Sequence, residues 1–330
     1  MYIGIYMKFL VLESHDSHLN LATEEYLFNN LDGELFMLWQ NAPTVVIGKS
    51  QNVRAEINSA YINENGVKLA RRITGGGAVY HDLGNLNYTF ISDRAEEGID
   101  FAFFTAPIIS ALESMGVNVS LTGRNDLVTD TGAKISGNAQ YSRNGRVLHH
   151  GTLLFSSDLD ALSLALKVDE EKIKSKAIKS TRSRVTNISD LLDTPMSMQE
   201  FIDTISGYII KTYSPEIISP PSPEQVADLY AKYSSDDWLY PTSTFLSGYT
   251  VTKKKRYPFG SVELSLAMDG ERISGVRIYG DFFGTKPTEE LEQLMIGKGT
   301  RELVEAIDDI PVGDYINGMT RDDLISLIES

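Results

Sequence analysis

The chain of 330 residues contains no cysteine. This absence excludes disulfide bonds, cysteine-ligated zinc, iron–sulfur clusters and thiol nucleophiles. Histidine is also scarce, and every histidine falls in the first 150 residues: His15, His18, His81, His149 and His150. We therefore expect the chemistry of the protein in its N-terminal half.

Long hydrophobic runs are missing as well, and no segment approaches the roughly 20 apolar residues that a membrane helix needs. Residues 1–12 are apolar but include Lys8 and lack a following cleavage site, so they predict a strand rather than a signal peptide. Basic residues are in deficit, with 30 Lys and Arg against 45 Asp and Glu and a net charge of -15. This balance disfavours nucleic acid and anionic membranes as partners. We expect a cytoplasmic protein.

The residues that are present describe a folded chain, because 42% are hydrophobic and 23% are charged. Their periodicity predicts an α+β fold, with helices and strands following each other along the chain. The expected helices cover residues 20–30, 101–115, 159–192, 197–213, 226–233, 288–307 and 321–328. The expected strands cover residues 35–40, 44–47, 67–73, 78–91, 134–140, 146–155, 262–268 and 273–279.

A change in amino-acid composition along the chain suggests two domains. Residues 214–223 hold four prolines and three serines, and a second irregular stretch covers residues 241–249. We place the boundary so that residues 1–245 form a large catalytic domain and residues 246–330 a small α+β accessory domain.

Three consecutive glycines, Gly75 to Gly77, follow Arg71 and Arg72. Glycines permit positive φ and a close backbone approach by a ligand, and arginine pairs well with phosphate. The segment therefore predicts a phosphate or adenylate cradle. It matches neither the dinucleotide fingerprint nor the Walker loop. A flexible surface turn beside a solvated basic pair is the alternative.

Two further segments contain candidate residues. Lys134 begins an expected strand beside small residues, and a lysine is a compact charge suited to the meeting point of a phosphate and a carboxylate. An exposed lysine at a strand edge is the simpler interpretation. His149 and His150 lie in the next strand, where a histidine pair is more often structural than catalytic.

Taken together, these segments resemble the lipoate-protein ligases, in the superfamily shared with biotin-protein ligases and lipoyl/octanoyl transferases. The accessory domain shows a weaker similarity, mainly around residues 260–264. The resemblance implies a catalytic domain with a mixed or antiparallel sheet flanked by helices. The matching segments are residues 20–25, 38–41, 45–48, 71–85, 123–127, 134–137, 149–154 and 182–187.

The resemblance also implies an activity. Members of this family activate lipoate with ATP to lipoyl-AMP and transfer the acyl group to a lysine of a lipoyl domain. By its match, Lys134 is the expected catalytic residue, contacting both ATP and lipoate. Further ATP contacts are expected from Arg72, Gly77, Ala78, Val79 and Tyr80, and further lipoate contacts from Arg71, Gly75 and Gly76.

Cofactors and partners follow from the same resemblance. Mg²⁺ is expected with ATP, and Asp126 is either a ligand of it or a structural cap of its loop. The expected acceptors are the lipoyl domains of 2-oxoacid dehydrogenase E2 subunits, the H protein of glycine cleavage, or both. Neither the preferred acceptor nor the choice between lipoate and octanoate follows from the residues.

Three alternatives stand beside the ligase. An ATP-independent lipoyl/octanoyl transferase shares the fold, but many such enzymes use a cysteine nucleophile, which this chain lacks. Biotin-protein ligases differ in their glycine-rich motif. A non-catalytic lipoate-binding paralogue is disfavoured by the intact set of Arg72, the triple glycine and Lys134.

Overall fold

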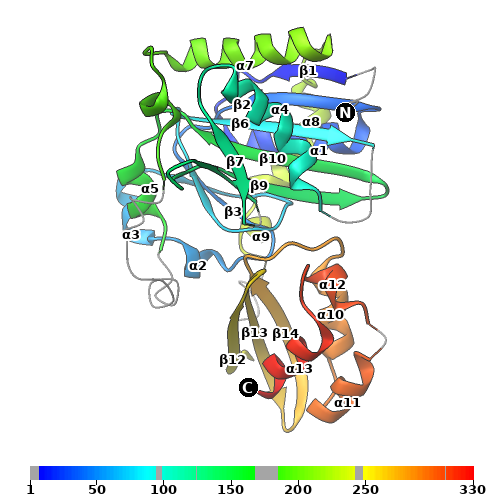
Figure 1. The fold of residues 1–330 in the computed structure, drawn as a ribbon. Helices are drawn as coiled ribbons and strands as arrows, with labels where there is room; N and C mark the ends of the chain where they lie inside the picture. Colours follow the sequence, from blue (N-terminus) through cyan, green and yellow to red (C-terminus); the bar gives the residue numbers. More distant parts are fainter. Residues whose placement is uncertain (1–6, 94–98, 124, 168–184, 242–247, 309) are drawn as a thin grey trace.

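The computed structural model describes residues 7–93, 99–123, 125–167, 185–241, 248–308 and 310–330. Two groups of elements lie one above the other in Figure 1, a larger N-terminal domain and a smaller C-terminal domain. None of the helices in the described residues has the length and apolar character that crossing a membrane requires.

The N-terminal domain is built on an eight-stranded sheet with the order β11-β1-β2-β6-β10-β9-β8-β7. The first strand pairs in parallel with its two neighbours, and the other pairs are antiparallel. The expected mixed sheet is thus confirmed. Its strands are β1 (Met7–Val11), β2 (Glu34–Trp39), β6 (Asn85–Ser92), β7 (Val119–Thr122), β8 (Asp126–Thr129), β9 (Lys134–Arg143), β10 (Arg146–Leu154) and β11 (Glu216–Ile217).

Helices cover both faces of this sheet, because successive residues of the central strands point to opposite sides. Phe36 and Leu38 pack with α4 (Phe101–Glu113) and α7 (Met198–Tyr213). Leu35 and Met37 pack with α1 (Ser17–Asn30) and α8 (Pro223–Tyr233) on the other face. Shorter helices complete the domain: α2 (Val53–Glu56), α3 (Ser59–Asn65), α5 (Leu159–Ala165), the 3-10 helix η2 (Ile188–Leu191) and α9 (Asp236–Leu239).

A separate three-stranded sheet holds the glycine-rich segment. Its central strand β3 (Thr44–Ile47) pairs in parallel with β4 (Lys68–Arg71) and antiparallel with β5 (Val79–His81). The segment between β4 and β5 is therefore fixed at both ends by the same strand. We call residues 72–78 the glycine loop.

The C-terminal domain has its own core. Strands β12 (Val251–Tyr257), β13 (Gly260–Asp269) and β14 (Arg272–Gly280) form an antiparallel sheet. Helices pack on it, with Leu264, Leu291 and Leu324 fully buried in the shared core. These helices are α10 (Thr288–Met295), α11 (Thr300–Ala306), α12 (Val312–Tyr315) and α13 (Arg321–Glu329).

The two domains touch at the glycine loop. The backbone nitrogen of Gly76 donates to the carbonyl of Phe282 at 3.1 Å, and that of Gly280 donates to the carbonyl of Ser50 at 2.9 Å. The ring of Phe283 lies edge-on to that of Phe101, with centroids 5.3 Å apart. The C-terminal domain thus covers one side of the loop. The predicted boundary at residue 245 lies outside the described residues and stays a prediction.

Two expected elements are divided. The strand expected over residues 78–91 is split between the two sheets, because Asp82 accepts a hydrogen bond from the backbone of Gly84 and turns the chain. The helix expected over residues 288–307 is interrupted where Gly297 adopts a φ of 81°. Of the lysine-rich stretch expected to be helical, residues 168–184 lie outside the described residues.

Candidate active site

A cavity opens between the glycine loop and the central strands of the large sheet. Five of the residues predicted to bind substrates line it: Arg72, Gly77, Ala78, Val79 and Lys134. The predicted residues Arg71, Gly75, Gly76 and Tyr80 are not part of its lining. The remaining wall consists of Leu21, Trp39, Val46, His81, Asn87, Asn125, Gly137, Asn138, Ala139, His150, Gly151 and Thr152.

Lys134 lies at the start of β9, where its side chain is about one-third exposed. Its ammonium nitrogen lies 2.7 Å from Oδ1 of Asp126 on the neighbouring strand β8. A Cβ at Gly137 would lie 3.0 Å from the same nitrogen, so the glycine leaves room for the lysine. The arrangement presents one positive charge at an opening whose walls are largely buried.

The side chain of Arg72 is buried beneath the glycines of the loop and stabilises the loop conformation. Nη2 donates to the carbonyls of Gly75 and Gly77 at 2.7 and 2.8 Å, and Nε donates to Oγ1 of Thr74 at 2.8 Å. Burial lowers the pKa of Arg72 to about 10, so the guanidinium remains charged at neutral pH. Its positive charge therefore lies directly under the predicted phosphate cradle.

The three glycines of the loop have different surroundings. A Cβ at Gly75 would lie 2.4 Å from the carbonyl oxygen of Phe282. Gly76 has a φ of 87°, and its Cβ position is crowded by the ring of Phe283. Gly77, which lines the cavity, has open space at its Cβ position. The first two glycines are thus required by contact with the C-terminal domain, and only the third faces the cavity.

Arg71 points away from the cavity into a cage of backbone carbonyls. Nε and Nη2 donate to Leu239, and Nε also contacts Trp238. Nη1 donates to three carbonyls of the preceding loop at 2.8 to 2.9 Å: Gly48, Lys49 and Gln51. The indole of Trp238 donates back to the carbonyl of Arg71 at 2.8 Å. This contact set joins α9 to the base of the glycine loop, and the predicted lipoate contact of Arg71 stays a prediction.

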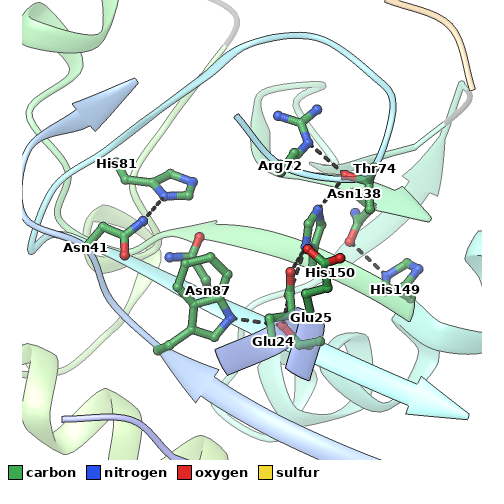
Figure 2. Close-up of polar contacts among 12 residues, drawn as sticks. Glu24, Glu25, Asn41, Arg72, Thr74, His81, Asn87, Asn138, His149 and His150 are labelled. Atoms are coloured by element: carbon green, nitrogen blue, oxygen red, sulfur yellow. Dashed lines mark hydrogen bonds and ion pairs between the residues drawn. The ribbon is translucent and has the colours of Figure 1, made fainter. Parts of the chain in front are cut away.

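A buried polar network connects the glycine loop to the large sheet, as Figure 2 shows. Nδ1 of His150 lies 2.9 Å from Oε1 of Glu24, and its Nε2 lies 2.8 Å from Oγ1 of Thr74. Because Arg72 also donates to Thr74, the network links α1, β10 and the glycine loop. The sequence did not identify Glu24 as part of the site. The available signal was that Glu24 lies in residues 20–25, one of the segments that match the family.

The two adjacent histidines have different roles. His149 projects to the other face of the sheet, where it stacks between Tyr88 and Phe104 with centroids 5.9 and 5.2 Å away. Burial keeps its pKa well below the usual value. His149 is thus a neutral core residue, as expected for such a pair, whereas His150 lines the cavity. In the described part of the chain, no group of three or more acidic, histidine or cysteine side chains could hold a metal ion.

Family models match most of the chain. The model described as the lipoyl protein ligase A/B catalytic domain matches residues 16–210, and the bacterial lipoate protein ligase C-terminus matches residues 247–328. The lipoate-protein ligase LplJ of Bacillus subtilis is 41% identical over 325 residues, covering 95% of this chain and 97% of the relative.

Solved structures agree with this match. LipL1 of P. falciparum, in complex with lipoate, superposes with a TM-score of 0.78 at 24% identity over 98% of this chain and 99% of the other, which supports the fold. A bipartite lipoate protein ligase of Thermoplasma acidophilum, described with its E2 lipoyl domain, has a TM-score of 0.62 at 30% identity over 72% of this chain and 97% of the other.

A lipoate-protein ligase A bound with ATP has a TM-score of 0.60 at 27% identity and covers 71% of this chain and 98% of the other. The ligands and acceptor named here were seen with those proteins. The family models and the similarity along nearly the full chain nevertheless establish one point: this chain belongs to the lipoate-protein ligase family.

Proposed function

We propose that the protein activates free lipoate with ATP and transfers the lipoyl group to a lysine of a lipoyl domain. The observation that carries this proposal is the position of Lys134, at the mouth of a cavity bounded by the glycine loop and otherwise largely apolar. An apolar tunnel with a charged mouth suits a fatty acid whose carboxylate must react. A relative bound with ATP and the 41% identity to a lipoate-protein ligase support it.

In the first half-reaction, a carboxylate oxygen of lipoate attacks the α-phosphorus of ATP. The new oxygen–phosphorus bond forms as the bond to the β-phosphate bridge breaks, so lipoyl-AMP and pyrophosphate result. Both reactants are anions, and their approach needs fixed positive charge at the meeting point. Lys134 supplies that charge at the mouth, and Arg72 supplies a second charge beneath the loop.

In the second half-reaction, the acceptor lysine amine attacks the acyl carbon of lipoyl-AMP. An amide bond forms, the carbon–oxygen bond to AMP breaks, and the amine loses a proton. Lys134 can stabilise the negative charge that develops on the acyl oxygen and the departing phosphate. Its ion pair with Asp126 keeps the ammonium at the mouth while no anionic substrate is bound.

Magnesium fits this site as a companion of ATP. Protein-bound Mg²⁺ usually takes one or two carboxylates, with phosphate oxygens and water as its other ligands. Asp126 is the carboxylate nearest Lys134 and is the residue we assign to it. The ion would neutralise phosphate charge.

The proposed acceptors are the lipoyl domains of 2-oxoacid dehydrogenase E2 subunits and the H protein of glycine cleavage. Support comes from the archaeal relative described with its E2 lipoyl domain. The transferase alternative remains disfavoured because the chain has no cysteine to carry the acyl group.

The test is lipoate-dependent exchange between ATP and pyrophosphate, run with the purified full chain. Apo lipoyl domain and apo H protein are added separately, and each is examined by mass spectrometry for the lipoyl increment. Exchange with a mass increase establishes the ligase and identifies its acceptor. Lipoate binding without exchange would instead favour the non-catalytic paralogue, and acyl transfer from a lipoylated protein without ATP would favour the transferase.

A further inference from the structure

Two buried nitrogen atoms in the cavity wall lack hydrogen-bond partners among the described residues. They are Nε2 of His81 and Nδ2 of Asn87. Both residues line the cavity, with only 3% and 1% of their surface exposed. Nearby, the indole of Trp39 donates to Thr89 and the Thr89 hydroxyl donates to Glu24. A buried donor without a protein partner is uncommon in folded proteins, and such a donor is satisfied by water or by a ligand.

The neighbours of His81 determine which ring nitrogen carries the proton. Nδ2 of Asn20 donates to Oδ1 of Asn41 at 3.0 Å, and this fixes the orientation of the Asn41 amide. Nδ2 of Asn41 must then donate to Nδ1 of His81, also at 3.0 Å (Figure 2). Burial lowers the pKa of His81 to about 3, so its ring is neutral at physiological pH. Since Nδ1 accepts, Nε2 carries the hydrogen and is a donor.

Within the residues that the structure describes, the Asn87 amide has one side-chain partner, Asn85. Nδ2 of Asn85 donates to Oδ1 of Asn87 at 2.9 Å. The carbonyl end of the Asn87 amide is therefore occupied, and its NH₂ end is left over. Asn85 is not part of the cavity lining.

Strand register places Asn87 at the end of the cavity remote from Lys134, and the ring of His81 lies beside Trp39 there, with ring centroids 6.0 Å apart. Asn87 lies opposite Trp39 on one side and Thr152 on the other, and directly paired residues share a face of the sheet. Oγ1 of Thr152 accepts from the backbone of Gly137, beside the Lys134 ammonium. Adjacent strands are about 4.8 Å apart, so Asn87 on β6 lies about 10 Å from β9. A fatty acid with its carboxylate at Lys134 would extend toward His81 and Asn87.

We propose that His81 and Asn87 are specificity-determining residues that donate hydrogen bonds to the dithiolane sulfurs of lipoate. The inference rests on the proposed function and names the part of the substrate that the inner end of the cavity recognises. Octanoate has only methylenes at the corresponding positions, so it leaves both donors unpaired. A site whose buried donors remain unpaired rejects the analogue that lacks the acceptor. The protein therefore selects lipoate over octanoate.

The first test uses the unaltered protein and three acids. Lipoate, octanoate and the cyclopentane analogue of lipoate, in which methylenes replace both sulfurs, are compared by kcat/KM for pyrophosphate release. The cyclopentane analogue keeps the ring shape and loses only the acceptors. Because sulfur is a weak acceptor, we expect lipoate to exceed both other acids by about tenfold. Equal use of lipoate and the cyclopentane analogue would overturn the proposal.

The second test removes one donor. Asn87→Leu should reduce the preference for lipoate over the cyclopentane analogue to about threefold, because an apolar side chain of similar size has no donor to leave unpaired while His81 still donates. Asn85→Ala removes the donor that holds Oδ1 of Asn87 but keeps the Asn87 amide at the cavity. Its preference should fall between those of the unaltered protein and Asn87→Leu.

The outcomes separate the two proposals. If no acid supports pyrophosphate release, the proposed function fails. If the acids react but folded Asn87→Leu keeps the original preference, only the assignment of these donors fails. If Asn87→Leu does not fold, the acid series on the unaltered protein still decides the inference.

Discussion

The ammonium nitrogen of Lys134 lies 2.7 Å from Oδ1 of Asp126, in an ion pair whose two side chains are 35% and 38% exposed. Ion pairs with this degree of exposure contribute at most about 1 kcal/mol to stability. The pair is therefore weak enough to be exchanged for contacts with an anionic substrate. An ion pair this weak contributes little to the fold, so it agrees with a catalytic rather than a structural role for Lys134.

Replacing Lys134 should affect chemistry far more than folding. For Lys134→Met we expect lipoate-dependent pyrophosphate release to fall about a thousandfold, because the charge that stabilises the transition state is lost. The free energy of unfolding, measured in urea, should change by less than about 1 kcal/mol. Asp126→Asn breaks the ion pair and removes the carboxylate assigned to Mg²⁺, so it should also lower the rate, but less than Lys134→Met does. Pyrophosphate release by Lys134→Met within a few-fold of normal would remove the lysine from the mechanism.

The glycine loop offers a matched pair of alanine substitutions. Gly77→Ala places a methyl group in open space beside the cavity, so the melting temperature should stay unchanged. The same methyl group should obstruct ATP if the nucleotide approaches the backbone there, and we expect the KM for ATP to rise about tenfold. An unaltered KM would argue against a nucleotide cradle at this residue.

Gly75→Ala should have the opposite pattern. Its Cβ would lie 2.4 Å from the carbonyl oxygen of Phe282, a distance that the backbone must relieve by moving. We expect a lower melting temperature and faster proteolysis between the domains. If Gly75→Ala melts like the unaltered protein, the contact between the loop and the C-terminal domain is not fixed in solution.

The sequence predicts those features that depend on neighbouring residues. Asn144 and Gly145 predict a two-residue turn, and the structure has both at positive φ between β9 and β10. The position of Lys134 at the start of a strand and the exposure of Gly77 to a cavity follow from local signals as well.

Features that depend on strand register could not be predicted. Glu24 and His150 are separated by 126 positions, and only the pairing of His150 with Thr89 brings the imidazole to α1. The two arginines before the glycine loop look equivalent in the sequence. The loop at Gly48 and the helix α9 are distant from each other in the sequence, and together they surround the Arg71 guanidinium with backbone carbonyls. The guanidinium of Arg72 instead lies beneath the glycines of the loop.

Arg71 provides a test of that difference. Arg71→Met removes the donor from five backbone carbonyls, and since each unpaired buried acceptor is costly, we expect a loss of about 3 kcal/mol or more in the free energy of unfolding. Arg71→Lys keeps the charge with fewer donors and should lose less. A rise in the KM for lipoate without a change in stability would instead place Arg71 on the acyl path, as the sequence predicts.

The buried ring of His81 should make stability depend on pH. Its pKa is about 3 in the folded protein, because burial disfavours the charged ring, whereas the pKa of an ordinary histidine is 6.5. As the pH falls below 6.5, the unfolded chain binds a proton that the folded chain does not, so stability is lost between pH 6.5 and pH 3. At pH 5 the loss from this residue should be about 2 kcal/mol relative to neutral pH.

Urea unfolding at pH 7 and pH 5, for the unaltered protein and His81→Gln, checks this prediction for His81. Glutamine keeps an acceptor for the Asn41 amide and does not titrate. Between pH 7 and pH 5, the free energy of unfolding of the variant should therefore fall by about 2 kcal/mol less than that of the unaltered protein. His149, whose pKa is also lowered by burial, is present in both proteins and cancels from the comparison. Identical losses in the two proteins would mean that His81 is not buried in the neutral form, and the donor assigned to its Nε2 would fail with it.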